Sequence, residues 1–456
     1  MSVVIVGAGP AGTRAAEVLV GAGVRPIVID EAPDNGGRIY QRQPAGFRRG
    51  ARTLYGFEAA KAQAIHDIFD RLRPSIDFRP RTLAWNLRPG LIDTISDGKA
   101  GAIPVAQTIL CTGAMDRVIP LPGWTLPGVF TLGGSQIALK AQGCAIGARV
   151  AFLGTGPLLY LVAYQYARAG AQIVCVLDTT PFTTKAAQAF ALMRGGATFA
   201  KGLYYIAWLR AHGITIAEGV TSLAIEGDGQ VEKLSWRDAR GLRHEVAADA
   251  VAVGFGLKPE AQLADLAGVP FDFDPVQHNW VPRKDSNGQT SVEGVFLAGD
   301  GSGIQGADLA EAAGARAAWA VLAARGLTVD ARAVARLDAT LAAGSNFRAA
   351  LERAFPFPAT LAADMADDTI LCRCEAITAG ELRAAANEAL ATLPPSEVNR
   401  AKALSRVGMG RCQGRVCGAA AAEVLAASLS CPVEQVGRLR GQPPVKPIPI
   451  LPAEAA

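Results

Sequence analysis

The opening residues carry a glycine pattern that restricts the local fold more than any other feature of the sequence. An apolar run at Val3–Val6 leads into Gly7, Gly9 and Gly12, spaced as G-x-G-x-x-G. In a dinucleotide-binding βαβ unit these glycines form a tight turn, let the backbone approach a pyrophosphate and let the helix pack on the strand. The pattern predicts, in order, a strand, a helical stretch and a second strand at Val3–Val6, Thr13–Val20 and Ile27–Ile29.

Two acidic residues, Asp30 and Glu31, follow the second predicted strand. A carboxylate at this place accepts hydrogen bonds from ribose hydroxyls, about twenty residues after the glycines. The spacing from Gly7 favours Asp30, whereas the spacing back from Gly36 favours Glu31, so both are candidates. The start of the helix, at Pro10 and Ala11, should offer free N–H groups to the phosphates.

Three further segments accompany this unit. Gly36-Gly37-Arg38 follows the acidic pair, Leu110-Cys-Thr-Gly-Ala114 closes an apolar run, and Val295-Phe-Leu-Ala-Gly-Asp300 comes much later. Together they resemble the FAD segments of the two-dinucleotide-domain flavoprotein reductases. The resemblance implies bound FAD, with Asp300 on the ribityl chain. It assigns FAD contacts to Gly7, Gly9, Pro10, Ala11, Gly12, Asp30, Glu31, Gly36, Gly37, Arg38, Thr112, Gly113, Gly299 and Asp300.

A second, incomplete fingerprint begins near residue 149. Gly154 and Gly156 supply the first two glycines, but Leu159 stands where the third should be. A leucine there is expected to push the helix from the strand and weaken a dinucleotide pocket. Asp178, at the end of the next predicted strand, would suit NAD rather than NADP. The alternatives are a working NAD site and a domain kept for architecture or for another nucleotide, and we favour the second.

Four of the eight cysteines form a spaced pattern. Cys372 and Cys374 give C-x-C, and Cys412 and Cys417 give C-x4-C after a long helical spacer. Four thiolates can hold a tetrahedral metal or an iron–sulfur cluster, and structural zinc prefers C-x2-C pairs. The spacing therefore favours iron, with zinc as the alternative. With glycines at 408, 410, 414 and 418, the module resembles the bacterioferritin-associated-ferredoxin-like [2Fe–2S] domain, which implies these four cysteines as ligands.

These patterns predict an α/β protein with two Rossmann-like domains, the second inserted in the first, and a small C-terminal helical domain. The expected parts are an FAD domain at 1–118 and 285–328, a degenerate NAD-type domain at 119–284, a helical linker at 329–366, a [2Fe–2S] domain at 367–430 and a Pro-rich tail at 431–456. The aromatic-rich stretch Lys185–His212 is expected to form a pair of helices that pack in the core.

Several functions are disfavoured. The net charge of +4 is small and no Lys/Arg run is interleaved with aromatic residues, so nucleic-acid binding has no support. The sequence has no uninterrupted apolar stretch of about 20 residues, so we expect no membrane span. The N-terminus lacks the basic region of a signal peptide. We therefore expect a cytoplasmic protein, with a peripheral position at the inner membrane face also open. No residue stands out as a catalytic base.

The whole chain, including the closing Pro-Pro-Val-Lys-Pro-Ile-Pro, resembles the larger (A or α) subunits of opine oxidases, heteromeric hydroxyproline and proline dehydrogenases and hydrogen cyanide synthase. The resemblance implies a smaller D-amino-acid-oxidase-like flavoprotein partner that oxidises a CH–NH or CH–NH2 donor. Electrons would pass through FAD and [2Fe–2S], beside an FMN at the subunit interface, to a quinone, a carrier or oxygen. The alternative is a self-sufficient NAD(P)H-dependent FAD/[2Fe–2S] reductase.

Overall fold

The computed structural model describes residues 2–44, 46–47, 49–392 and 397–449. Its first sheet is entirely parallel and is built from both ends of the predicted FAD domain. In spatial order its strands are β20 (Val295–Leu297), β7 (Gln107–Leu110), β1 (Val3–Val6), β2 (Ile27–Ile29) and β3 (Asp77–Arg79). The two N-terminal strands lie where the glycine pattern predicted them.

The alternation of side chains along β1 explains why both faces of this sheet are covered. Val3 and Ile5 pack in one cluster with α1 (Pro10–Gly21), α3 (Ala59–Leu72) and α10 (Ala307–Ala324). Val4 and Val6 pack on the other side, in a cluster shared with three antiparallel strands. These strands are β4 (Thr82–Arg88), β5 (Leu91–Ser96) and β6 (Lys99–Pro104).

The second sheet is also entirely parallel and contains the second fingerprint. Its order is β12 (Ile216–Glu218), β11 (Gln172–Asp178), β10 (Arg149–Thr155), β16 (Ala250–Phe255) and β9 (Val129–Thr131). Helices α4 (Leu132–Ala141) and α5 (Pro157–Arg168) contact it. The α/β class with parallel sheets is thus confirmed. An antiparallel sheet of β13 (Thr221–Glu226), β14 (Lys233–Arg237) and β15 (Arg243–Ala247) accompanies it.

Short ladders connect the two sheets. Strand β8 (Ala114–Asp116), directly after β7, pairs with β17 (Leu257–Pro259), directly after β16. Beyond β17 lie α9 (Gln262–Leu266) and a hairpin of β18 (Phe271–Asp274) and β19 (Asn279–Pro282). Leu263 and Ala264 of α9 pack in the same cluster as Val4 and Val6, so this segment lies against the first sheet.

The aromatic-rich stretch differs from the expected core pair. It forms three helices, α6 (Phe182–Ala187), α7 (Ala189–Met193) and α8 (Ala197–Ala211). Tyr205 is buried, but Phe190 is 73% exposed and Tyr204 is 42% exposed. The expectation that these aromatic residues fill a core was therefore wrong for Phe190 and Tyr204. Tyr204 lies on α8, which is apolar on more than the one face that packs on α5, and Phe190 lies on the short helix α7, of which only Leu192 is buried.

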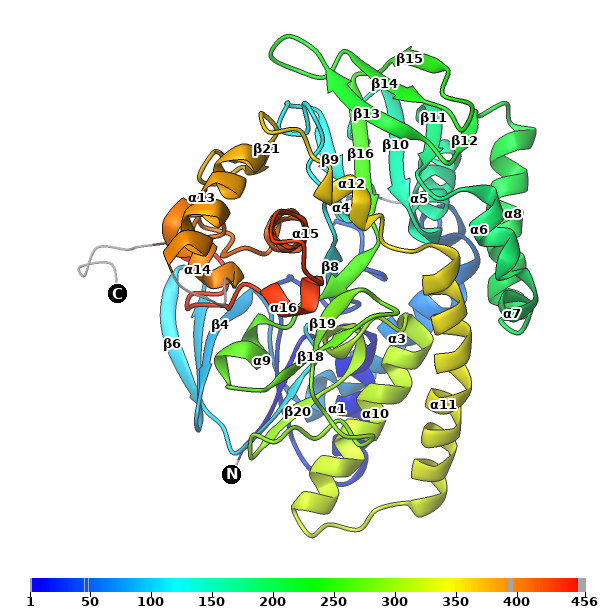
Figure 1. Cartoon of the computed structure of the whole chain (residues 1–456). Coiled ribbons are helices and arrows are strands. Elements are labelled where there is room, and N and C mark those ends of the chain that lie inside the picture. Colours follow the sequence, from blue (N-terminus) through cyan, green and yellow to red (C-terminus); the bar gives the residue numbers. More distant parts are fainter. Residues whose placement is uncertain (1, 45, 48, 393–396, 450–456) are drawn as a thin grey trace.

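The predicted linker forms α11 (Ala331–Ala354), which runs beside α10 (Figure 1), and the short α12 (Ala359–Ala363). The cysteine module, residues 367–430, contains a two-stranded ladder and three helices. They are β21 (Ile370–Cys372), β22 (Ile377–Thr378), α13 (Ala379–Thr392), α14 (Val398–Ser405) and α15 (Gly418–Ser428). A short helix, α16 (Val433–Val436), follows.

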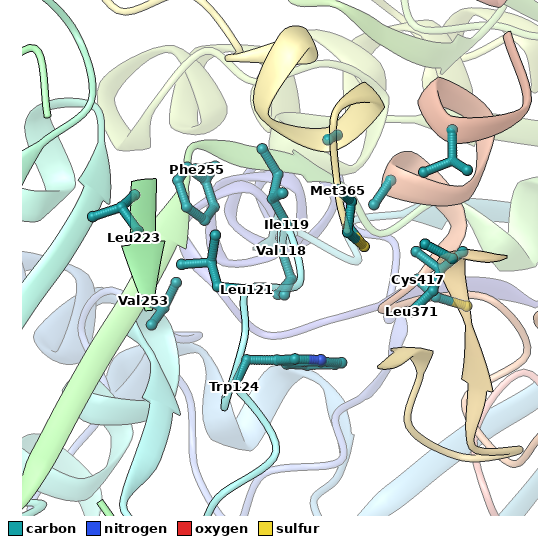
Figure 2. Packing of buried hydrophobic residues seen from close by; sticks show 14 of the residues in the cluster. Val118, Ile119, Leu121, Trp124, Leu223, Val253, Phe255, Met365, Leu371 and Cys417 are labelled. Carbon is teal, nitrogen blue, oxygen red and sulfur yellow. The ribbon is translucent and has the colours of Figure 1, made fainter. Parts of the chain in front are cut away.

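One continuous hydrophobic cluster joins the cysteine module to the second sheet. Figure 2 shows Ile119 and Trp124, from the segment after β8, between Phe255 of the sheet and Leu371 and Cys417 of the module. The Trp124 indole Nε1 also donates a hydrogen bond to the Ile370 carbonyl over 2.6 Å. The module is therefore packed firmly on the rest of the chain.

The described part of the Pro-rich tail crosses to the first sheet. Val445 is 3% exposed in the cluster that contains Val4 and Val6, and its amide donates to the Trp85 carbonyl over 3.1 Å. Residues 450–456, the end of the predicted tail, lie outside the described residues. Within the described ranges, no helix combines the length and the apolar character that a bilayer crossing requires.

Candidate cofactor sites

Two positions of the first glycine turn, Gly7 and Gly12, are too crowded for any side chain. Gly7 has a φ of +106°, and a Cβ placed on it would lie 2.3 Å from the Cys111 carbonyl oxygen. A Cβ on Gly12 would lie 1.9 Å from the Gly7 carbonyl oxygen. No side chain caps the helix α1 that starts at Pro10, so its first N–H groups are available to a phosphate.

The other predicted FAD segments converge on this turn. The Gly36 amide donates to the Ala8 carbonyl over 2.9 Å. A Cβ on Gly37 would lie 3.0 Å from the Gly9 Cα, and one on Gly299 would lie 3.0 Å from the Ala11 Cβ. Segments that are far apart in the sequence therefore meet around the N-terminus of α1.

The Thr112-Gly113 turn, the remaining predicted FAD segment, adjoins the same group. A Cβ placed on Gly301, two residues after Gly299, would lie 2.5 Å from the Thr112 Oγ1. The Cys111 amide, one residue earlier, donates to the Val6 carbonyl at the end of β1 over 2.8 Å. All four predicted segments thus lie together at one edge of the first sheet.

The two candidate ribose acids have different surroundings. The Asp30 carboxylate accepts hydrogen bonds from the Ala8 amide (2.6 Å) and the Ala32 amide (2.7 Å), and burial raises its pKa. Glu31 pairs instead with Arg38 and with Lys446 of the tail, the latter over 2.5 Å. Burial opposes ionisation of Glu31, but these cations outweigh it and lower its pKa. Both residues lie at the end of β2, so both stay candidates.

Asp300 is the last residue of the fourth predicted FAD segment and lies just before the turn that leads into α10. Its Oδ1 accepts from the amides of Gln305 (2.8 Å) and Gly306 (2.9 Å). Gly306 precedes α10 and offers no side-chain cap. The carboxylate thus fixes the loop that leads into this helix.

The second fingerprint is occupied by its own side chains. Asp178 is 0% exposed, and its carboxylate accepts from the Tyr160 hydroxyl (2.6 Å), the Lys185 ammonium (2.8 Å) and the Thr180 amide (2.8 Å). Leu159 is also 0% exposed. Asp178 is fully buried with both oxygens engaged, whereas Asp30 is partly exposed and Glu31 is exposed, so Asp178 has little capacity left for a ribose hydroxyl.

The four cysteines of the pattern lie together in two pairs. The Cys372 thiol is hydrogen-bonded to the Cys417 thiol, and the Cys374 thiol to the Cys412 thiol. All eight cysteines of the chain are free. Within the described ranges, however, no three His, Cys, Asp or Glu side chains gather as ligands of one metal ion. The thiols are therefore adjacent in pairs rather than arranged as one four-ligand shell.

The Cys372 thiol is set up to ionise. The neighbouring Cys417 thiol lowers its pKa to about 5, despite partial burial, with help from the backbone amides of Gly408, Glu375 and Cys374. The pKa of Cys417 is raised correspondingly, because it donates its proton to Cys372. A thiolate is the form of cysteine that binds a metal.

Comparison with known proteins identifies a family for the N-terminal part of the chain. Residues 1–317 match the family described as pyridine nucleotide-disulphide oxidoreductase. The chain therefore belongs to this family of oxidoreductases. The cysteine module lies outside the matched residues.

Several similar proteins match this chain over nearly its full length. The chain is 35% identical to the A subunit of opine oxidase from Rhizobium meliloti, over 98% of this chain and 86% of that one. It is 31% identical to the HcnB subunit of hydrogen cyanide synthase from Pseudomonas protegens, over 98% and 96% of the two chains. Among solved structures it shares the fold of L-proline dehydrogenase from P. horikoshii, with a TM-score of 0.73, 18% identity and 98% and 78% coverage.

Several residues that contact the predicted sites belong to no motif in the sequence and could not be predicted from it. Glu260 binds the loop between Cys412 and Cys417 through Arg415, and Lys446 binds Glu31. Lys140, 2% exposed, donates to the Ile39 carbonyl over 3.0 Å beside the Gly36-Gly37 segment. These partners are separated by 101 to 415 residues, so no spacing rule could have joined them.

Proposed function

We propose that this chain is the FAD- and [2Fe–2S]-binding subunit of a heteromeric oxidoreductase that acts on a carbon–nitrogen bond. The observation that carries the proposal is the pairing of Cys372 with Cys417 and of Cys374 with Cys412 beside a converged set of flavin segments. The nearly full-length similarity to subunits of opine oxidase and hydrogen cyanide synthase supports the heteromeric assignment.

The paired thiols fit a [2Fe–2S] cluster better than zinc. A [2Fe–2S] cluster takes four cysteine thiolates, two on each iron, whereas structural zinc takes four ligands in one tetrahedral shell. Two adjacent pairs supply the first arrangement. The amides that point at Cys372 also suit a cluster, because hydrogen bonds to its sulfurs tune its potential.

The flavin assignment depends on the fit of the converged turn to a pyrophosphate. Gly7, Gly9 and Gly12 would let the backbone approach it, and the free N–H groups at the start of α1 would bind it. Asp30 or Glu31 would accept from the ribose, and Asp300 would lie toward the ribityl chain. When bound, FAD supplies the hydride and electron chemistry, and the chain positions it and tunes its potential.

A partner protein completes the proposal. The bond-breaking step belongs to the smaller flavoprotein that the family resemblance implies. An FMN at the interface between the two and the final acceptor are part of the same proposal. The NAD(P)H-dependent reductase is the second candidate, and the fully engaged Asp178 counts against it.

The test is the metal and flavin content of the full-length chain purified without oxygen, together with Cys412→Ser. We expect bound FAD and iron in the unaltered protein and a paramagnetic signal after reduction. Cys412→Ser should abolish the signal and keep the FAD. The matched control is Cys431→Ser, because Cys431 is half-buried, free and outside the pattern. Zinc alone, or an unchanged signal in Cys412→Ser, would contradict the proposal.

A further inference from the structure

A short segment after β17 touches both predicted cofactor sites. The backbone amide of Glu260 donates to the Gly113 carbonyl over 3.0 Å, and its carbonyl accepts from the Thr112 hydroxyl over 2.5 Å. Thr112 and Gly113 belong to the predicted FAD segments. These two hydrogen bonds satisfy the amide and the carbonyl of one residue, so they hold the backbone of Glu260 against the flavin site.

The side chain of Glu260 points the other way, to the cysteines. Its Oε2 accepts from Arg415 Nε (3.1 Å) and Nη2 (2.5 Å). The two side chains are only 13% and 19% exposed. A largely buried pair of this kind is costly to break, because removal of one partner leaves the other charge uncompensated.

Arg415 lies inside the cysteine loop, Cys412–Cys417. Its backbone amide donates to the Cys412 carbonyl over 3.0 Å, so the guanidinium is attached to the turn that presents both cysteines. Gln262 adds a second link, from its Nε2 to the Gln413 carbonyl over 3.2 Å. A displacement of Glu260 would therefore be transmitted to the loop that carries two of the four predicted ligands.

We propose that the Glu260–Arg415 pair is a positioning contact that couples the two sites, so that FAD bound at the Thr112-Gly113 turn stabilises the cysteine loop and slows the loss of its metal. The inference rests on the proposed function, since it needs both groups. Coupling between two sites is reciprocal. Metal bound at the cysteine loop therefore tightens FAD binding by the same factor by which FAD tightens metal binding at equilibrium.

The experiment measures the rate at which a colour-forming iron chelator removes iron from the full-length chain, with FAD bound and after FAD has been removed. In the unaltered protein we expect removal to be about tenfold slower with FAD bound, within the usual range of such couplings. In Arg415→Gln this ratio of rates should fall close to one, because, among the described residues, only the Gln262–Gln413 hydrogen bond still joins the segment to the loop. The reciprocal readout is the dissociation constant of FAD with and without iron.

Arg438→Gln is the matched control. Arg438 binds Asp265 through two hydrogen bonds of 2.7 and 2.6 Å, joins the same regions of the chain and is similarly buried, but lies outside the cysteine loop. This variant should keep the dependence of iron loss on FAD. The exchanged pair Glu260→Arg with Arg415→Glu should restore part of it, which a general loss of packing would not allow.

The outcomes separate the two proposals. An unaltered protein that holds no iron overturns the proposed function and the coupling with it. If iron and FAD are both present but Arg415→Gln keeps the same ratio of rates, only the coupling is overturned. Should Arg415→Gln fold poorly, Glu260→Gln removes the same pair while keeping both backbone contacts to the turn, and the same two rates decide.

Discussion

At the scale of residues, one buried charge, Lys140, lies beside the predicted flavin site. Lys140 of α4 lies against the segment that follows Gly36-Gly37 and has the Ile39 carbonyl as its hydrogen-bond partner. Burial lowers the pKa of Lys140 to about 8. An ammonium held by a neutral carbonyl is a cost to the folded state at neutral pH, because a carbonyl compensates only part of the lost hydration.

The first prediction concerns Lys140→Met. In the unfolded chain the pKa of lysine is 10.5 and in the folded chain about 8, so the unfolded state binds more protons between these values. The unaltered protein should therefore gain stability as the pH rises through 8, by up to about 3 kcal/mol toward pH 10 relative to the variant. Urea unfolding of both proteins from pH 7 to 9.5 measures this difference. A constant difference would contradict it.

Other groups do not disturb this comparison. Burial lowers the pKa of Lys258 to about 8 as well, and it raises the pKa of Cys111 and Cys175 to about 12. These groups are present in both proteins, so their contributions cancel in the difference. Only the titration of Lys140 remains.

At the scale of elements, the two βαβ units differ in whether the glycine turn leaves room for a nucleotide. Helix α1 begins at a bare glycine turn, whereas the turn before α5 leads to the fully buried Leu159 and the engaged Asp178. Lys185 of α6 covers the second turn, and its ammonium lies 5.6 Å from the ring centroid of Phe355, which follows α11. A residue from the linker region thus takes part in sealing the second unit.

The prediction for this element is that restoring the glycine will not restore a nucleotide site. Leu159→Gly should destabilise the protein by about 4 kcal/mol, roughly 3 from the lost burial and 1 from glycine in a helix. It should gain no reaction with NADH, because Asp178 stays bound to Tyr160 and Lys185. Anaerobic addition of NADH to both proteins measures the flavin absorbance, with dithionite as the positive control. Rapid bleaching of the unaltered protein would favour the reductase alternative.

The C-terminal tail links distant parts of the whole molecule. After the cysteine module it returns to the first sheet, where Val445 joins the cluster of Val4 and Val6 and Lys446 reaches Glu31. Together with the cluster around Ile119 and Trp124, this gives the C-terminal part of the chain contacts with both parallel sheets. The module is thereby held at two places rather than suspended from a linker.

Truncation tests the role of the tail. A chain ending at Gly441 loses Val445 and Lys446, and should lose about 2 kcal/mol of stability, mostly from the buried valine, and release FAD more readily. A chain ending at Pro449 keeps both contacts and is the control. Thermal unfolding and the rate of FAD release, measured on both chains, test whether the shorter chain is less stable and loses FAD faster. Equal behaviour of the two would show that the tail contributes nothing to the site.

The sequence by itself determined the elements whose signals are local. The sequence predicted the glycine turn at Gly7–Gly12 and the strands Val3–Val6 and Ile27–Ile29. Tight turns and buried strands impose residue types within a few positions, so their signals can be read locally. The same reasoning failed for Phe190 and Tyr204, since an apolar pattern does not say which face another element will cover.

Only the tertiary structure decided how the predicted sites are closed and joined. Glu260 and Arg415 are 155 residues apart, and Glu31 and Lys446 are 415 residues apart, so each pair depends on how two sheets, a module and a tail pack together. Likewise the engagement of Asp178 needed Lys185 and Tyr160 in place around it. A charged residue in a sequence has many possible partners, and packing selects one of them.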